Sequence, residues 1–174
     1  KDIKKALNTL HERFFEVKTK QLNLFITGVG NVGGKLLQQM QQQKRFLREN
    51  LRLKIRVTGL SNSKTMIFNE NGIDLDQWKI LLDQGETANA DTFFDKAKEM
   101  NLRNSIFVDN TANEQIAMVY KKYLKESIAV VTCNKIACAD EYQSYNELKE
   151  LSRKYNASFL FETNVGAGLP IIDT

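Results

Sequence analysis

The sequence predicts an α/β domain in which helices cover both faces of a parallel β-sheet. The first observation behind this prediction is that short apolar segments alternate with amphipathic segments along most of the chain, as they do in successive βαβ units. The second is composition: apolar residues make up 42% of the chain, against nine glycines and one proline, which is typical of a globular domain and excludes general disorder. The third is the length of 174 residues, which suits one domain.

The elements are predicted in order along the chain. A first helix is predicted before residue 20, because apolar side chains recur at three- and four-residue intervals between Ile3 and Val17. Apolar runs then predict strands at residues 22–27, 51–60, 105–109, 128–132 and 158–161. Helical spacing predicts further helices at residues 32–49, 75–82, 91–100, 112–124 and 140–155. A polar loop is expected after the second strand. Within that strand, Arg52, Lys54 and Arg56 alternate with apolar residues, and this alternation predicts an open face at the start of the strand.

Charge and composition exclude several classes of protein. Lys and Arg exceed Asp and Glu by 25 to 21, a net charge of +4 that is scattered along the chain, so no nucleic-acid partner is indicated. No apolar run reaches the ~18–20 residues of a membrane span. The two cysteines, Cys133 and Cys138, form no CxxC pair and fit the reducing cytoplasm, where we expect the protein. Because the chain starts without Met or an apolar signal segment, we expect it to derive from a longer protein.

A glycine-rich turn follows the first strand directly. Residues 28–33 read Gly-Val-Gly-Asn-Val-Gly, the pattern G-x-G-x-x-G, between an apolar strand and an amphipathic helix. In the Rossmann dinucleotide-binding fold the first glycine makes the tight turn, the second lets the backbone approach a pyrophosphate, and the third lets helix and strand pack closely. The helix N-terminus adds free N–H groups and a partial positive charge. The alternative interpretation is a turn that needs glycine only for its backbone conformation.

The loop after the second strand bears on the choice of cofactor. NAD-specific sites place an Asp or Glu there, which binds the ribose 2′-hydroxyl. This chain has Ser61-Asn62-Ser63-Lys64 and no carboxylate before Glu70. Hydroxyl, amide and ammonium groups can hold a 2′-phosphate that a carboxylate would repel. The pattern therefore favours NADP, or use of both NADP and NAD, unless the segment is an ordinary polar loop.

Three further segments follow predicted strands, at the edge where open α/β sheets bind ligands. They are Asp-Asn-Thr-Ala at 109–112, Thr-Cys-Asn-Lys at 132–135 and Glu-Thr-Asn-Val-Gly-Ala-Gly-Leu-Pro at 162–170. With the glycine turn and Ser-Asn-Ser-Lys, these motifs make the chain resemble the nucleotide-binding part of homoserine dehydrogenase, in particular the form that is fused behind an aspartokinase. The resemblance runs from about Leu22 to the end of the chain, and the last motif is the most specific.

The resemblance implies reduction of L-aspartate 4-semialdehyde to L-homoserine by a nicotinamide hydride, on the threonine and methionine branch of amino-acid biosynthesis. It implies cofactor contacts at Gly28, Val29, Gly30, Asn31, Val32 and Gly33 for the pyrophosphate, Asn62, Ser63 and Lys64 for the adenosine ribose, and Thr111 and Asn134 for the nicotinamide side. Lys135 matches the family's lysine at the junction of cofactor and substrate, where a cation counters charge that develops on the substrate oxygen. Two departures from the family pattern lie beside it, because Cys133 replaces the usual proline and Ile136 replaces a second lysine.

The resemblance also implies a monovalent-cation site, for an ion such as sodium, in the last motif. Its ligands would be the carboxylate of Glu162 and the backbone carbonyls of Val165, Ala167 and Leu169. Oxygen ligands alone suit a hard cation rather than zinc. The alternative is that Glu162 bonds to backbone N–H groups of its own turn.

The resemblance divides the chain at residue 20. Residues 1–19 would form a linker helix that follows a preceding domain, and residues 20–174 a Rossmann domain that binds NAD(P). A substrate-binding and dimerisation region would follow Thr174, so that the intact enzyme would be a homo-oligomer and this chain alone would not turn over substrate. Two alternatives stay open: another semialdehyde or amino-acid dehydrogenase on the same fold, and a non-catalytic domain that senses dinucleotides.

Overall fold

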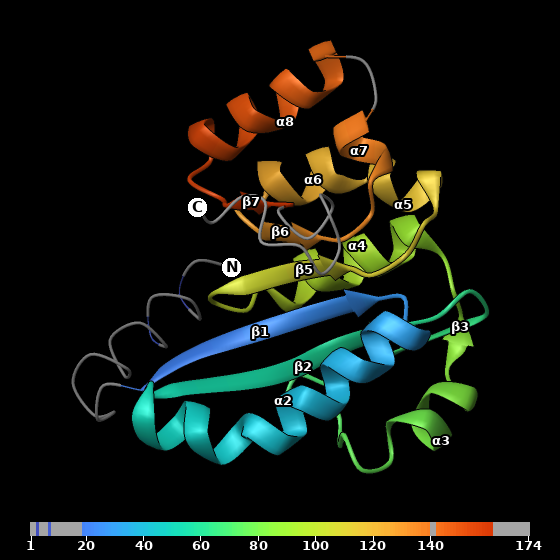
Figure 1. The fold of residues 1–174 in the computed structure, drawn as a ribbon, viewed down its shortest axis with the longest axis vertical. Coiled ribbons are helices and arrows are strands. Elements are labelled where there is room, and N and C mark those ends of the chain that lie inside the picture. The colour runs from blue at the N-terminus through green and yellow to red at the C-terminus, as the bar shows by residue number, and fades with distance from the viewer. Residues whose placement is uncertain (1–2, 4–6, 8–18, 140–141, 162–174) are drawn as a thin grey trace.

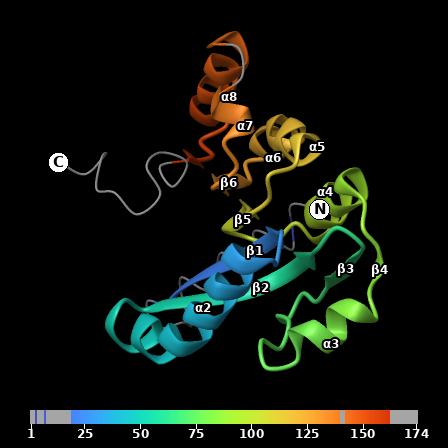
Figure 2. The ribbon, with the colours of Figure 1, turned by 45° about the vertical axis from the view of Figure 1, so that its right-hand side comes forward.

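The computed structural model describes residues 3, 7, 19–139 and 142–161. It contains a seven-stranded sheet in the order β4-β3-β2-β1-β5-β6-β7. Figure 1 labels its strands from β7 to β3, and Figure 2 labels β4 at the other edge. The parallel strands are β1 (Lys20–Thr27), β2 (Leu53–Ser61), β5 (Ser105–Asp109), β6 (Ala129–Thr132) and β7 (Phe159–Leu160). At one edge, β3 (Thr65–Phe68) and β4 (Glu86–Thr87) run antiparallel. The predicted parallel α/β sheet is therefore confirmed, with two antiparallel strands added.

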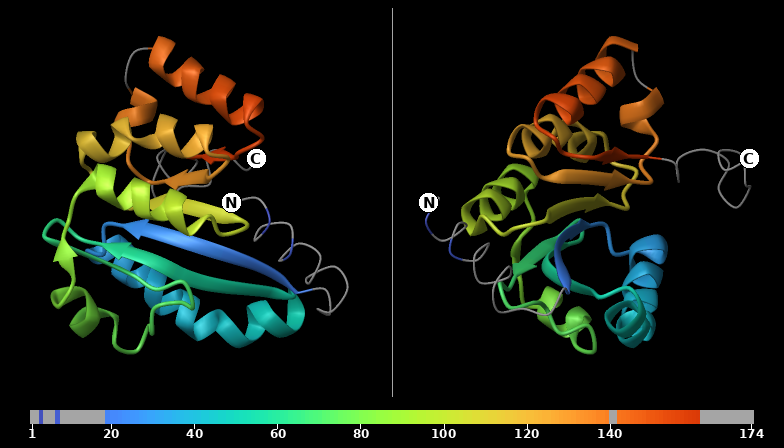
Figure 3. Two further views of the ribbon diagram at one scale, coloured as in Figure 1. Left: turned by 180° about the vertical axis from the view of Figure 1, so that it is seen from behind. Right: turned by 90° about the vertical axis from the view of Figure 1, so that its left-hand side faces the viewer.

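Helices cover both faces of the sheet (Figures 2 and 3). The first group, whose apolar side chains join the core cluster around Leu24 and Ile26 of β1, comprises α2 (Asn31–Asn50) and α3 (Trp78–Asp83). The second group joins the cluster around Phe25, Phe107 and Val130 and comprises α4 (Ala90–Met100), α5 (Glu114–Met118), α6 (Tyr120–Lys125), α7 (Ile136–Ala139) and α8 (Tyr142–Lys154). Alternate residues of β1 thus face opposite cores, as the two-residue period of a strand requires. No helix of the described ranges combines the length and the apolar character that a bilayer span needs.

The helices begin in two different ways. At α4 and α5 an asparagine caps the first turn: the side chain of Asn89 accepts from Thr92 N at 2.9 Å, and that of Asn113 accepts from Gln115 N at 2.8 Å. By contrast, α2 begins after Gly30 with no side-chain cap and no acidic residue in its first turn. The N–H groups at the start of this 20-residue helix are therefore left to another acceptor.

The strand order changes direction between β1 and β5. The chain passes from β1 to β2 on one side of β1 and later enters β5 on its other side. In open α/β sheets, ligands bind outside the carboxyl ends of the strands at such a reversal. The glycine turn leaves β1 at this point.

The structure differs from the predicted elements in three places. The predicted polar loop after β2 contains β3, and a further segment pairs with it as β4. Val119 separates the helix predicted over 112–124 into α5 and α6, and the separate helix α7 precedes the one predicted over 140–155. Apart from residues 3, 7 and 19, the predicted first helix lies outside the described residues.

The open face predicted at the start of β2 is confirmed. Lys54 is exposed, and Arg56 is half-buried. The guanidinium of Arg56 donates from Nη1 to the backbone oxygen of Glu70 at 2.9 Å. From Val57 to Ser61 the strand is fully buried, so the open face is confined to the first half of β2.

Candidate dinucleotide-binding site

The turn after β1 is packed tightly against the loop that follows β5. Gly28 has φ +87°, and a Cβ at that position would lie 2.7 Å from Cγ2 of Thr111 and 2.9 Å from the carbonyl carbon of Asn110. Its N–H donates to the backbone oxygen of Ser61 at 2.9 Å. Only glycine combines this left-handed backbone with this close approach. The first glycine of the motif therefore joins the ends of β1, β2 and β5.

The other two glycines of the motif face opposite surroundings. A Cβ on Gly33 would lie 1.9 Å from the backbone oxygen of Gly28, so helix α2 rests directly on the turn. A Cβ on Gly30 would meet nothing within 4 Å. The structure itself therefore requires glycine at 33, whereas the bare backbone at 30 borders open space beside the uncapped start of α2. That is the arrangement a pyrophosphate needs.

A pocket of about 550 Å³ opens beside this turn. It lies between the start of α2 and the ends of β5 and β6, and it is lined by Asn31, Val32, Lys35, Leu36, Gln39, Val108, Asn110, Val131, Thr132 and Cys133. Mostly apolar walls with a few polar groups are typical of cofactor sites. Within the lining, Asn31, Lys35 and Gln39 are four residues apart along α2, and this helical spacing is a signal that could have identified the last two from the sequence.

Asn110 is another lining residue that the predicted cofactor contacts do not include, although it belongs to the motif at 109–112. Its Nδ2 group is buried and has no hydrogen-bond acceptor among the described residues. A buried amide N–H without an acceptor costs free energy of about 1–3 kcal/mol. Asn110 lines the pocket with other atoms, because the Nδ2 atom itself has almost no accessible surface.

The Ser-Asn-Ser-Lys segment forms the hairpin turn between β2 and β3. Asn62 N donates to Thr65 O at 3.0 Å, and Asn62 Oδ1 accepts from the backbone N–H groups of Lys64 and Thr65, both at 2.7 Å. Ser63 and Lys64 are exposed at the tip. Since Ser61 pairs with Thr27, this tip stands beside the glycine turn. The side chain of Asn62 shapes the turn, and Ser63 and Lys64 are presented to solvent.

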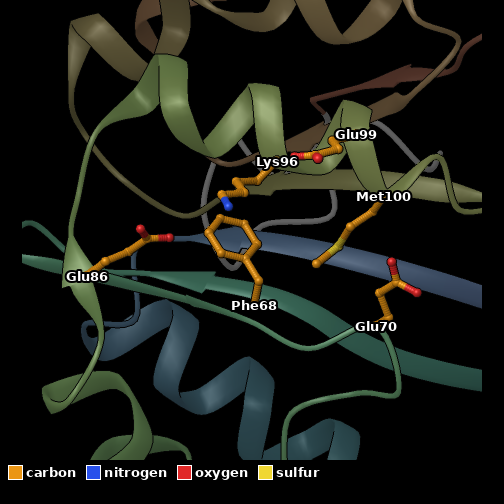
Figure 4. A pocket seen from close by; sticks show the side chains of 6 residues that line it. All are labelled: Phe68, Glu70, Glu86, Lys96, Glu99 and Met100. Atoms are coloured by element: carbon orange, nitrogen blue, oxygen red, sulfur yellow. The ribbon is translucent and has the colours of Figure 1, made fainter.

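The first carboxylate after β2 lies elsewhere. Because β3 runs back along β2, with Phe68 opposite Gly59, Glu70 is carried away from the carboxyl end of β2. Figure 4 shows Glu70 and Glu86 on either side of Phe68, in a separate pocket of about 520 Å³ that Lys96, Glu99 and Met100 of α4 complete. This second pocket shares no lining residue with the first. The 61–64 turn, which is predicted to lie at the ribose, therefore contains no carboxylate.

The residues predicted on the nicotinamide side take different positions. Thr111 is half-buried, and its hydroxyl accepts from Asn113 N at 3.2 Å. Asn134 is 1% exposed, and its amide donates to Asp109 Oδ2 at 3.1 Å and to Asn113 O at 3.0 Å. Lys135 is exposed directly after it. It does not line the pocket, whereas Cys133, two residues earlier, does.

Cys133 is a thiol at the pocket wall, not an activated nucleophile. Burial raises the pKa of the Cys133 thiol above its ordinary value, and the charge of Asp109 raises it further. The thiol is therefore protonated at neutral pH, and the thiolate is the reactive form.

The predicted cation ligands Glu162, Val165, Ala167 and Leu169 lie outside the described residues. Within the described ranges, no three His, Cys, Asp or Glu side chains gather as they would around a metal ion.

Comparisons with known proteins place the chain in a family. The family model described as homoserine dehydrogenase, NAD binding domain, matches residues 28–162. A bifunctional aspartokinase/homoserine dehydrogenase of Haemophilus influenzae is 39% identical over 169 residues, which cover 97% of this chain and 20% of that protein. A homoserine dehydrogenase of Schizosaccharomyces pombe is 34% identical over 156 residues, 88% of this chain and 41% of that protein.

Solved structures show the same fold. A hyperthermophilic archaeal homoserine dehydrogenase in complex with NADPH superposes with a TM-score of 0.71 and 25% identity, covering 88% of this chain and 47% of that one. A Candida auris protein of unknown function superposes with a TM-score of 0.74 and 28% identity, covering 89% and 42%. The chain thus spans about a fifth of the length of its bifunctional relative and under half of these structures. From the glycine turn to the end of the described sheet, the chain belongs to the family of homoserine dehydrogenase NAD-binding domains.

Proposed function

We propose that the chain binds NADP across the glycine turn, as the cofactor-binding part of an enzyme that interconverts L-aspartate 4-semialdehyde and L-homoserine. One observation carries the proposal: the bare backbone at Gly30 borders open space between an uncapped helix start and a 550 Å³ pocket. When bound, the nicotinamide supplies or accepts the hydride of the reaction.

The residues of this chain hold and orient the cofactor. The N–H groups at the start of α2 face the pyrophosphate, since Gly30 has no side chain in the way and α2 has no cap of its own. The adenosine end reaches Ser63 and Lys64 at the end of β2, and the nicotinamide end reaches the pocket at the ends of β5 and β6.

Binding is tested by thermal unfolding of the chain in the presence of NADP and of NAD. A ligand at 100 times its Kd stabilises the folded state by about 2.7 kcal/mol, so the midpoint should rise with NADP, and at lower concentration than with NAD. No rise with either cofactor at saturating concentration contradicts the proposed function. A tighter Kd for NAD contradicts the preference alone.

Lys64 is expected to carry much of the preference for NADP. It is exposed at the tip of the β2–β3 turn, where no carboxylate opposes a 2′-phosphate. Lys64→Ala should weaken NADP binding about tenfold, the loss of one charge-assisted hydrogen bond. Calorimetry should show the affinity for NAD unchanged. Lys96→Ala is the matched control, because Lys96 is an exposed lysine at the other pocket. Equal losses for both cofactors would refute the assignment.

Four further parts of the proposal rest on the family resemblance or, for the cytoplasmic location, on the two cysteines. They are the linker role of residues 1–19, homo-oligomeric assembly of the intact enzyme, its cytoplasmic location, and a monovalent cation held by Glu162 and the carbonyls of Val165, Ala167 and Leu169. Oxygen ligands of this kind fit a hard cation.

A further inference from the structure

Four polar side chains form a buried network behind the nicotinamide end of the pocket. Asp109 ends β5, Thr132 ends β6, Tyr120 begins α6 and Asn134 follows β6; none is more than 1% exposed. Oδ2 of Asp109 accepts from the hydroxyl of Tyr120 and from Nδ2 of Asn134. The hydroxyls of Tyr120 and Thr132 lie 2.7 Å apart. We refer to these four residues as the buried network.

The buried network fastens two loops to each other. In the loop after β5, Oδ1 of Asp109 accepts from Thr111 N at 2.7 Å, and Nδ2 of Asn134 donates to Asn113 O at 3.0 Å. In the loop after β6, the hydroxyl of Thr132 accepts from Asn134 N at 2.9 Å. Because Asp109 and Thr132 are paired across the sheet, the two loops start side by side. One connected set of hydrogen bonds therefore fixes the backbone of both.

A buried carboxylate is a costly way to hold two loops if stability is its only purpose. Taking a charge out of water is repaid only when its hydrogen bonds are complete. Asp109 has three donors, from Tyr120, Asn134 and Thr111 N. Burial and the adjacent charge of Asp109 raise the pKa of Tyr120 well above its ordinary value, so the phenol keeps the proton that it donates. What such a network supplies, and apolar packing does not, is a fixed loop geometry.

The two loops that the buried network fixes border one half of the candidate site. Asn110, Thr132 and Cys133 line the pocket, whereas Ser63 and Lys64 stand at the end of β2. In the order β2-β1-β5-β6, β1 and its glycine turn separate these groups. A dinucleotide laid across that turn therefore has one end at β2 and the other beside the buried network.

We propose that Tyr120 is a positioning residue which, through Asp109 and Thr132, holds the loops after β5 and β6 in the geometry that the nicotinamide half of the cofactor requires. This inference rests on the proposed function. The inference distinguishes the two halves of the ligand, because the loops that the network fixes extend from the nicotinamide end to the glycine turn and do not include the β2–β3 turn at the adenosine end. Loss of the Tyr120 hydroxyl should therefore weaken contacts to the nicotinamide half and leave the adenosine half unaffected.

The test compares two ligands on the same variants. Tyr120→Phe keeps the ring that packs on Phe107 and Phe159, and Thr132→Val keeps the side-chain shape, so each removes one hydroxyl from the network. Calorimetry should show the affinity for NADP reduced about tenfold, the effect of roughly one hydrogen bond to a charged group. The affinity for adenosine 2′,5′-bisphosphate, which lacks the nicotinamide half, should equal that of the unmodified chain.

Tyr123→Phe is the matched control. Tyr123 is also a fully buried tyrosine of α6, but its hydroxyl has no hydrogen-bond partner among the described residues, so its removal should change neither affinity. If Tyr120→Phe and Thr132→Val bind NADP as the unmodified chain does, or lose both ligands equally, the positioning role is refuted. If the unmodified chain binds neither ligand, the proposed function itself is refuted.

Discussion

Replacing Gly30 by valine is expected to lower the affinity of the chain for NADP by about a hundredfold, or about 2.7 kcal/mol, while the free energy of unfolding changes little. A Cβ at Gly30 would meet no atom of the chain within 4 Å. The side chain would instead fill the space between the start of α2 and the pyrophosphate. Calorimetric titration with NADP and urea unfolding measure the two quantities separately.

Gly33→Ala is the matched variant, with the opposite expectation. Its Cβ would lie 1.9 Å from the backbone oxygen of Gly28, so the turn and the helix would have to separate, and we expect the free energy of unfolding to fall by about 3 kcal/mol. A Gly30→Val chain that unfolds normally and binds NADP with unchanged affinity would place the cofactor away from the glycine turn.

The sequence predicts the strand–turn–helix unit well because that unit is local. The apolar run of β1, the three glycines and the amphipathic helix lie within 31 consecutive residues of the chain, from Lys20 to Asn50, and each has its own pattern. The antiparallel strands β3 and β4 have four and two residues. Strands this short carry too little pattern to identify. The pairing of β3 with β2 is decided by the hairpin turn at Asn62–Thr65, and β4 then pairs with β3.

The residues of the candidate site also divide into those that can be predicted from neighbouring residues and those whose partners are distant in the sequence. Gly28 and Gly33 can be interpreted from the motif because their role depends on the backbone next to them. Asn134 cannot, because its partners Asp109 and Asn113 are 25 and 21 residues away and meet it only when β5 and β6 pair. The predicted contact of Asn134 with the nicotinamide remains a prediction, and in the structure its amide is engaged within the protein. The buried network as a whole has no sequence pattern, since it joins the ends of two strands and a helix.

Lys135 is the residue for which we expect the largest effect on catalysis. The measurement uses a chimera in which this chain replaces the matching segment of the Haemophilus influenzae bifunctional relative, which is 39% identical. In that chimera, Lys135→Ala should lower kcat for homoserine-dependent reduction of NADP by about a hundredfold, the usual cost of losing one group that stabilises a developing oxyanion. The affinity for NADP should remain within about twofold, or ~0.4 kcal/mol, because Lys135 is exposed beside the pocket and does not line it.

The design separates a chemical role for Lys135 from a failure to fold. Binding of NADP by the chimera reports on the folding of the exchanged segment, because domains of one chain can fold independently. Lys44→Ala is the control for loss of one positive charge, since Lys44 is an exposed lysine of α2. Full dehydrogenase activity in the Lys135→Ala chimera would show that Lys135 does not contribute to catalysis. A chimera with intact kinase activity and NADP binding, but no homoserine oxidation even with Lys135 present, would favour a domain that binds dinucleotides without catalysis. Rapid turnover that depends on Lys135 and not on Lys44 would assign the ammonium group to the substrate oxygen, because charge alone, placed elsewhere on the domain, would have no such effect.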